Sequence, residues 1–229
     1  MRAMKVRAVC FDYGGTLDAP GVHWLERFAA LYQTAGLHRS WEQIRAAFDH
    51  ATHCAYTEPG MAEIGLQPLI DFHVQRQLEH LGVNDAQLAR EVTTGFVDTS
   101  RAALADSRRV LEHLRSRVRL GVISNFYGNV HHLLEEAGIG AALAVVIDSN
   151  RVGVSKPDPA IFALAVAQLG CQPRDVLYVG DSFSKDVVGA RSAGLRTGWL
   201  AGATQRPCPA PELVDLHLRS LDELIGIIE

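Results

Sequence analysis

Residues 6–17 read VRAVCFDYGGTL, and the interpretation of the whole chain starts from this stretch. Its first half is an apolar run of β-prone residues, which predicts a buried strand. The run ends at Asp12, and Gly14 and Gly15 then allow a sharp turn before Thr16. Because open α/β sheets bind ligands at the carboxyl ends of their strands, Asp12 is the first candidate for chemistry. The alternative is that Asp12 only caps a turn, as aspartate often does.

Length and composition indicate a globular protein. The 229 residues can form one substantial core together with a smaller domain. The composition is 48% hydrophobic and 21% charged, with a net charge of -4, so we expect neither nucleic acid nor a membrane surface as a partner. The four cysteines form no C-x-x-C pair, which indicates reduced thiols. Without a signal-peptide pattern or a membrane-length apolar segment, the expected location is the cytoplasm. The sequence makes no prediction of oligomeric state.

The segment from residue 18 to about 103 predicts helices only. Its apolar residues recur at helical spacing, and we expect helices at 23–36, 40–56, 67–82 and 84–98. Ser40 and Asn84 are the expected N-caps of the second and fourth of these helices. No strand pattern interrupts the segment, so it is interpreted as an all-helical insertion.

From Asp106 onward, strands and helices alternate. Asp106 or Ser107 is the expected N-cap of a helix at 108–116. Strands are expected at 118–124, 143–148, 175–180 and 197–201, with helices at 129–138, 159–170 and 184–194 between them, then a last short strand and a helix at 221–228. Strands separated by helices of this length predict βαβ units and a parallel sheet, so the fold class is α/β.

Polar residues follow two further strands of the predicted sheet. Ser124 and Asn125 end one strand and can donate hydrogen bonds to an anion, although capping of the next helix is the simpler interpretation. Lys156 precedes a proline, so its position is fixed and its ammonium group could neutralise a phosphoryl group. A solvated surface lysine is the alternative. Asp158 is followed by Pro159, which favours a structural N-cap.

Two acidic residues follow the strand at 175–180. Asp181 and Asp186 lie around one turn, and carboxylates that converge near Asp12 are costly unless a cation joins them. Oxygen-only ligands suit Mg²⁺. The alternative is that Asp181 caps a helix and Asp186 faces solvent on its first turn.

The four segments together resemble the haloacid dehalogenase-like (HAD) hydrolase superfamily. The segments FDYGGTL, VISN, SKPDP and GDSFSKD occur in that order, with a helical insertion after the first. The resemblance implies a Rossmann-like core formed by residues 1–17 and 104–229 and a helical cap formed by residues 18–103. It further implies a hydrolase that acts on a small, phosphorylated substrate with Mg²⁺ as cofactor.

The resemblance also assigns roles residue by residue. Asp12 matches the nucleophile that becomes an aspartyl phosphate, Ser124 matches the hydroxyl that binds the transferring group, and Lys156 matches the charge that steadies both. Asn125 joins Ser124 and Lys156 as a candidate for substrate binding. The implied metal ligands are Asp12, Asp181, Asp186 and the backbone carbonyl of Gly14, with Asp181 the more direct ligand of the acidic pair.

Gly14 is a departure from the pattern of the family's phosphatases. They usually carry an aspartate at this position, which protonates the leaving group and then activates water. Glycine has no proton to give, and loss of a general acid/base costs roughly 10²- to 10⁴-fold in rate.

Three interpretations remain open. In the first, the protein is a Mg²⁺-dependent phosphatase whose acid comes from a cap histidine such as His23 or His53, or whose leaving group needs little protonation. In the second, it is a dehalogenase-type enzyme in which the nucleophile attacks carbon. The retained acidic pair argues against this interpretation, and residues 18–103 contain no lysine for a phosphonate-cleaving relative. In the third, it is a binding or regulatory protein with little turnover.

The cap is expected to select the substrate. Candidate residues that line the site are Asp18, His23, Trp24 and the region from His53 to Glu58.

Overall fold

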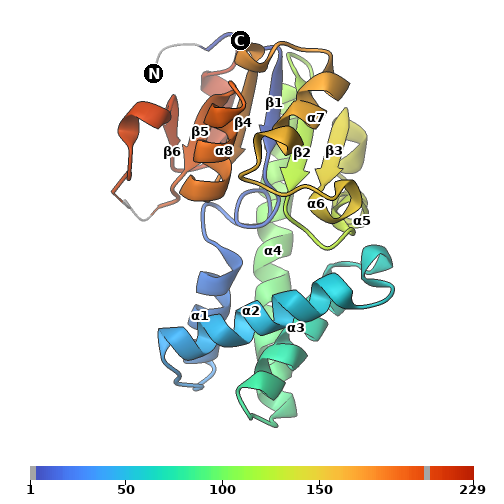
Figure 1. The fold of residues 1–229 in the computed structure, drawn as a ribbon. Coiled ribbons are helices and arrows are strands. Elements are labelled where there is room, and N and C mark those ends of the chain that lie inside the picture. Colours follow the sequence, from blue (N-terminus) through green and yellow to red (C-terminus); the bar gives the residue numbers. More distant parts are fainter. Residues whose placement is uncertain (1–3, 204–206) are drawn as a thin grey trace.

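A computed structural model describes residues 4–203 and 207–229, so residues 1–3 and 204–206 of the predicted core lie outside it. Figure 1 shows a sheet with flanking helices in one half of the molecule and a group of helices in the other. Within the described ranges, no helix is long and apolar enough to cross a membrane.

The sheet has six parallel strands in the order β3-β2-β1-β4-β5-β6. Their bounds are β1 Ala8–Phe11, β2 Arg119–Ser124, β3 Val145–Asp148, β4 Val176–Gly180, β5 Arg196–Leu200 and β6 Leu216–Leu218. The chain winds outward from β1 in one direction and from β4 in the other, so the strand order reverses between these two neighbours. Ligands bind at such a switch point in open α/β sheets. The predicted α/β class is confirmed.

The two faces of the sheet are both covered. Val9 and Phe11 point into the core cluster that contains Leu111 of α4 and Leu133 of α5. Ala8 and Cys10 pack instead with residues of α7 and α8 on the opposite face. The side chains of β1 therefore alternate between two apolar layers, as expected for a strand buried on both sides.

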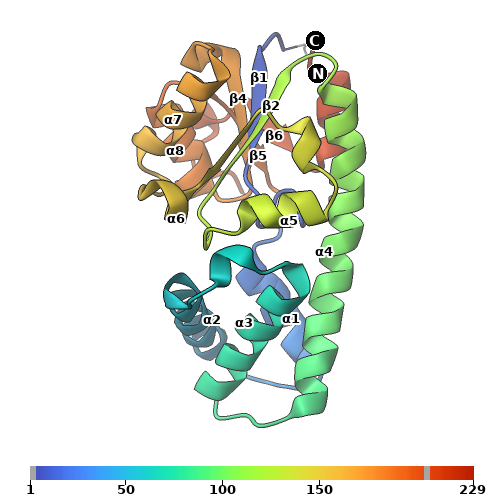
Figure 2. The ribbon, with the colours of Figure 1, turned by 90° about the vertical axis from the view of Figure 1, so that its right-hand side faces the viewer.

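The helical half consists of helices that follow the predicted segments. They are α1 Trp24–Thr34, α2 Trp41–Thr57, η1 Met61–Glu63, α3 Leu66–His80 and the first part of α4 Ala86–Leu114 (Figure 2). The helices and short helical turns of the sheet half are α5 Val130–Glu136, η2 Gly140–Ala142, α6 Ser149–Val152, α7 Pro159–Leu169, η3 Pro173–Asp175, η4 Phe183–Val187, α8 Val188–Ser192, η5 Pro211–Leu213 and η6 Leu221–Gly226. Ser40 forms the N-cap of α2 in a reciprocal capping box with Gln43, so its prediction is confirmed.

Helix α4 differs from the prediction. It is one helix of 29 residues, and its N-cap is Asp85 rather than Asn84. The predicted cap at Asp106 or Ser107 is wrong, because no glycine or proline lies within residues 96–114 and the Ser107 hydroxyl donates to the carbonyl of Leu17 at 2.7 Å. Figure 2 shows α4 running beside both halves of the molecule. The expected boundary between residues 103 and 104 thus falls within a continuous helix, and the division into core and cap stays a prediction.

The interior of the helical half contains a buried histidine. His73 of α3 is fully buried, and neither ring nitrogen has a hydrogen-bond partner among the described residues. Its ring packs against Trp24, Phe28 and Tyr127. Burial in these apolar surroundings lowers the pKa of His73 from 6.5 to about 3.

This buried histidine predicts acid sensitivity. Between pH 6.5 and about 3 the unfolded chain binds a proton that folded His73 excludes, so the free energy of unfolding falls as the pH falls. In the variant His73→Leu, the loss of stability between pH 7 and pH 5 should be smaller by about 2 kcal/mol. Urea unfolding at both pH values measures this. The exposed His80 on the same helix supplies the control variant His80→Gln, which keeps the buried imidazole of His73. An equal pH response in all three proteins would contradict the prediction.

The two halves also share a helix cap. The N-cap of α3 is Gly65, which offers no side chain, and the Glu136 carboxylate of α5 accepts instead from the Leu66 backbone N–H at 2.8 Å. Asn129 adds a second link by donating to the carbonyl of Ile64 at 3.0 Å. Side chains from the sheet half therefore hold the start of a helix in the other half.

Removal of this cap should destabilise the protein. We expect Glu136→Ala to lower the free energy of unfolding by about 1 kcal/mol, the usual cost of losing an N-cap acceptor. Glu135→Ala is the matched control, because Glu135 is exposed on the same helix and the α3 N-terminus bonds to Glu136 instead. Equal midpoints of urea unfolding for the two variants would show that the interaction contributes nothing.

Candidate active site

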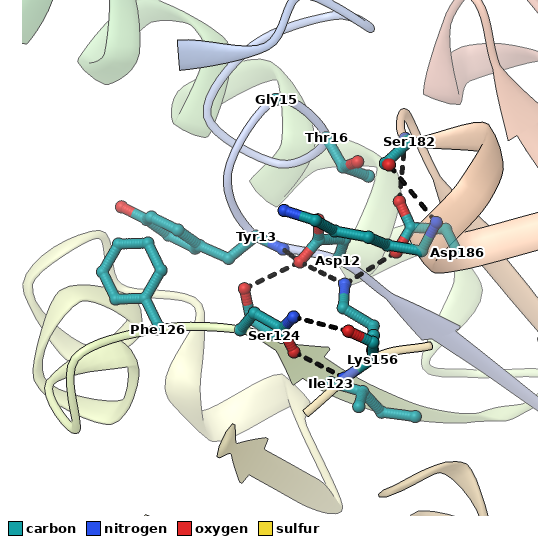
Figure 3. A network of polar contacts seen from close by, with 12 residues as sticks. Asp12, Tyr13, Gly15, Thr16, Ile123, Ser124, Phe126, Lys156, Ser182 and Asp186 are labelled. Atoms are coloured by element: carbon teal, nitrogen blue, oxygen red, sulfur yellow. Dashed lines mark hydrogen bonds and ion pairs between the residues drawn. The ribbon is translucent and has the colours of Figure 1, made fainter. Parts of the chain in front are cut away.

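Asp12 lies immediately after the central strand β1. Its backbone N–H continues the sheet by donating to Val179 at 2.9 Å. Its Oδ1 atom accepts from the Tyr13 backbone at 2.8 Å and from the Ser124 hydroxyl at 2.7 Å. The Lys156 ammonium nitrogen lies 2.9 Å from the same oxygen. Three donors therefore converge on one carboxylate oxygen and fix its orientation, as Figure 3 shows.

Lys156 connects Asp12 to Asp186. Its Nζ atom donates to Asp186 at 2.7 Å and to the Tyr178 hydroxyl at 2.8 Å, and that hydroxyl donates in turn to the carbonyl of Ile123. Burial alone would lower the pKa of Lys156, but the charges of Asp12 and Asp186 outweigh burial and raise it. The ammonium group is therefore held in its charged form between two carboxylates.

Asp181 follows β4 and approaches the loop after β1. A Cβ atom at Gly15, whose φ is +83°, would lie 2.7 Å from the Asp181 carboxylate, so only glycine allows this approach. The Thr16 hydroxyl donates to the same carboxylate at 3.4 Å. Burial, together with the charges of Asp186 and Asp12, raises the pKa of Asp181 well above 3.8. Burial likewise raises the pKa of Asp186, against the opposing effect of Lys156.

The three carboxylates fit a divalent metal ion. Oxygen atoms of Asp12, Asp181 and Asp186 all lie within 4.8 Å of one another, and all three residues are buried. Lys156 supplies one positive charge, so the ionised cluster has a net charge of -2. Burial is the main cause of the raised pKa values of Asp181 and Asp186, and repulsion between the carboxylates adds to it. A hard divalent cation with oxygen ligands, such as Mg²⁺, would supply the missing charge.

The remaining candidates of the core have definite positions. Asn125 exchanges two hydrogen bonds with the backbone of Lys156, at 2.9 and 2.8 Å, and so positions the lysine. Asp158 accepts from the Ala160 N–H as the N-cap of α7, which confirms its structural role. Asp186 is fully buried, and the Lys156 ammonium group links its carboxylate to that of Asp12.

A cavity of about 410 Å³ opens over Asp12 between the two halves of the molecule. Of the predicted site residues, those that line it are Asp12, Gly14, Ser124, Asn125, Lys156 and Asp181. The sheet half supplies these residues, and α1 and α2 supply much of the opposite wall. The volume suits a small ligand, since drug-sized sites span roughly 300 to 1,000 Å³.

Only some of the expected cap residues line this cavity. His23 and Trp24 do, and Tyr56 is the member of the 53–58 region that reaches it. Asp18 does not, which corrects the prediction. Its carboxylate is fully buried and accepts from the Gly15 N–H at 2.7 Å and from the Arg27 guanidinium at 3.0 Å, so it braces the loop instead.

Sequence reasoning missed about half of the cavity wall. The face of α2 that carries the predicted Tyr56 also carries Arg45, Phe48, Asp49 and Thr52, and the other missed residues are Leu25 of α1 and Phe126, Tyr127, Ser182 and Lys185 of the sheet half. The α2 residues recur at helical spacing, which was visible in the sequence. Which face of the helix turns toward the site depends on how the helix packs, and that could not be deduced from the spacing alone.

Comparison with known proteins identifies the family of this chain. A family model described as haloacid dehalogenase-like hydrolase matches residues 6–194. The chain is 30% identical over 229 residues to a phosphoserine phosphatase of Thermus thermophilus, covering 95% of this chain and 90% of that protein. It is 34% identical over 236 residues to haloacid dehalogenase-like hydrolase domain-containing protein 3 of Danio rerio, covering 96% of each.

Solved structures show the same fold at lower identity. A dehalogenase aligns with a TM-score of 0.64 at 22% identity, covering 96% of both chains. A HAD phosphatase from Thermococcus onnurineus aligns with a TM-score of 0.56 at 23% identity, covering 99% of this chain and 97% of that one. The family match, the full-length relatives and the arrangement of the four segments agree, and the chain belongs to the haloacid dehalogenase-like hydrolases.

Proposed function

We propose that this hydrolase is a Mg²⁺-dependent phosphatase that acts on a small phosphorylated metabolite through an aspartyl phosphate on Asp12. The observation that supports this most strongly is the convergence of Ser124 and Lys156 on Asp12, beside the acidic pair, in one small cavity. A full-length relative named as a phosphatase is consistent with the proposal. The proposal includes the division into a core of residues 1–17 and 104–229 and a cap of residues 18–103, since the cavity is lined from both.

In this mechanism a carboxylate oxygen of Asp12 attacks phosphorus, and the bond from phosphorus to the leaving oxygen breaks. Lys156 and the Ser124 hydroxyl then hold the transferring group in line, because both already point at the attacking carboxylate. Bound Mg²⁺, held by Asp12, Asp181 and the Gly14 carbonyl with Asp186 behind, would neutralise charge on the phosphoryl oxygens. Water then attacks the aspartyl phosphate and restores Asp12.

A dehalogenase-type enzyme and a binding protein are the two alternatives to the phosphatase. Gly14 favours a dehalogenase-type enzyme or a binding protein, because neither needs an acid at that position. The buried acidic cluster favours the phosphatase, because attack on carbon needs no cation to neutralise the transferring group. Calorimetric binding of phosphometabolites without turnover would favour the binding protein over either enzyme.

Replacement of the nucleophile tests the mechanism directly. Asp12→Asn should reduce Mg²⁺-dependent hydrolysis of 4-nitrophenyl phosphate to the background rate, because the amide cannot form the aspartyl phosphate. Asp158→Asn is the control, because Asp158 lies on the surface and asparagine caps a helix equally well. Retained hydrolysis by Asp12→Asn would exclude the covalent route.

Removal of the metal tests the role of the acidic cluster. A chelator should abolish hydrolysis of 4-nitrophenyl phosphate, and excess Mg²⁺ should restore it. Calorimetry should show that Asp181→Asn binds Mg²⁺ at least about tenfold more weakly, because the cluster loses one charged ligand. Undiminished hydrolysis in chelator would count against the proposal. Halide release from a 2-haloacid under the same conditions would instead identify a dehalogenase.

A further inference from the structure

Four arginines line one shallow groove at the amino end of the sheet. The groove has a volume of about 500 Å³, and the arginines are Arg7, Arg115, Arg117 and Arg119. Arg7 directly precedes β1 and Arg119 begins β2, and the Arg119 backbone N–H donates to the Arg7 carbonyl at 3.1 Å. Figure 1 shows that β1 and β2 begin at the end of the sheet half that faces away from the helical half. The groove is therefore separate from the candidate active site, which lies at the carboxyl ends of the same strands.

The positive charge of this groove is not balanced locally. On the last turns of α4, Arg108 pairs with Glu112 at 2.8 Å. None of the four groove arginines forms an ion pair with a carboxylate among the residues that the structure describes, and all four are exposed. The sequence gives the reason, because residues 1–11 and 113–134 contain no aspartate or glutamate. A chain with a net charge of -4 therefore carries four unbalanced positive charges in one groove.

Structural contacts explain only part of this cluster. Arg117 donates to the carbonyl of Ile228 at 3.0 Å, and Arg119 donates to the carbonyl of Leu169. Arg115 follows the last residue of α4, where the helix dipole favours a cation. Carbonyl oxygens are neutral, so these contacts hold the side chains in place without cancelling their charge. Because each guanidinium group has five N–H donors, every arginine of the groove keeps donors for a ligand.

The chemistry of the groove matches a chain of phosphate groups. The planar fork of a guanidinium group fits two phosphate oxygens at once. A single phosphate monoester carries a charge of about -2, which balances only half of the four arginines, whereas two or three linked phosphates balance most of it. The volume lies within the range of roughly 300 to 1,000 Å³ that small-molecule sites span, which favours a small ligand over a nucleic acid polymer.

We propose that this groove is a second binding site, specific for a small polyphosphate anion with two or more linked phosphate groups, either inorganic or attached to a nucleoside. The site needs no metal ligand and no residue of the candidate active site. It is therefore independent of the proposed phosphatase function, and either proposal can fail without the other.

The test is a calorimetric titration with inorganic tripolyphosphate, ATP and AMP at low ionic strength in buffer free of divalent metal. Without metal, the acidic cluster around Asp12 keeps its excess of negative charge and repels anions, so binding at the groove is measured separately. The variants are Arg7→Gln and Arg115→Gln, because neither side chain has a hydrogen bond or ion pair among the described residues that its loss would break. Arg90→Gln is the control, because Arg90 is exposed on α4 and does not line the groove.

We expect the wild type to bind tripolyphosphate and ATP at one site, at least about tenfold more tightly than AMP. Arg7→Gln and Arg115→Gln should each weaken tripolyphosphate binding by about tenfold, the effect of losing one charge-assisted contact with phosphate, and Arg90→Gln should match the wild type. Equal affinities for tripolyphosphate and ATP would show that the phosphate chain alone is recognised, and tighter binding of ATP would identify a nucleoside polyphosphate as the ligand.

Three results would overturn this proposal. The first is the absence of saturable binding of tripolyphosphate and ATP, and the second is equal affinity of all three variants and the wild type. The third is binding of a single-stranded RNA oligonucleotide without binding of tripolyphosphate, which would assign the groove to a nucleic acid polymer. None of these results bears on hydrolysis at Asp12.

Discussion

The site depends on the Lys156 ammonium group, which lies between the carboxylates of Asp12 and Asp186. Buried charges of one sign repel strongly, and this one cation holds together carboxylates from the segments that follow two different strands, β1 and β4. A buried ion pair of this kind is weak evidence for stability, since desolvation offsets most of the attraction. Its significance is geometric, because removal of Lys156 would leave like charges facing each other in the core.

The parallel sheet makes this arrangement possible. β1 and β4 are neighbours at the point where the strand order reverses, so Asp12 and Asp181 leave the same edge of the sheet side by side. β2 lies on the other side of β1 and brings Ser124 to the same edge. Gly15 then lets the loop after β1 approach Asp181 as closely as it does. The parallel direction of the strands and the small size of Gly15 therefore bring together Asp12, Ser124 and Asp181, which are far apart in the sequence.

The helical half is joined to the catalytic loop as well as lying over it. Arg27 of α1 bonds to Asp18 and also to the carbonyl of Phe96 and the hydroxyl of Ser100 on α4. Asp18 in turn accepts from Gly15 in the loop that follows Asp12. The position of α1, and with it the placement of His23 and Trp24, is thus tied by hydrogen bonds to the loop that carries the nucleophile. The wall of the cavity and the loop form one polar network.

The sequence by itself determined the α/β class, the order of strands and helices, and the identity of the polar residues at the strand ends. These features are local, because hydrophobic periodicity and turn residues specify them over a few positions. The break expected near Asp106 was wrong, since the contact that satisfies Ser107 comes from Leu17, 90 residues away. Only the tertiary structure decided that Asp18 braces a loop, that α2 turns Arg45 and Asp49 to the cavity, and that Trp24 fills the space beside Gly14. Each depends on how one helix is rotated and packed against the sheet half, and helical spacing fixes which residues share a face but not which way that face points.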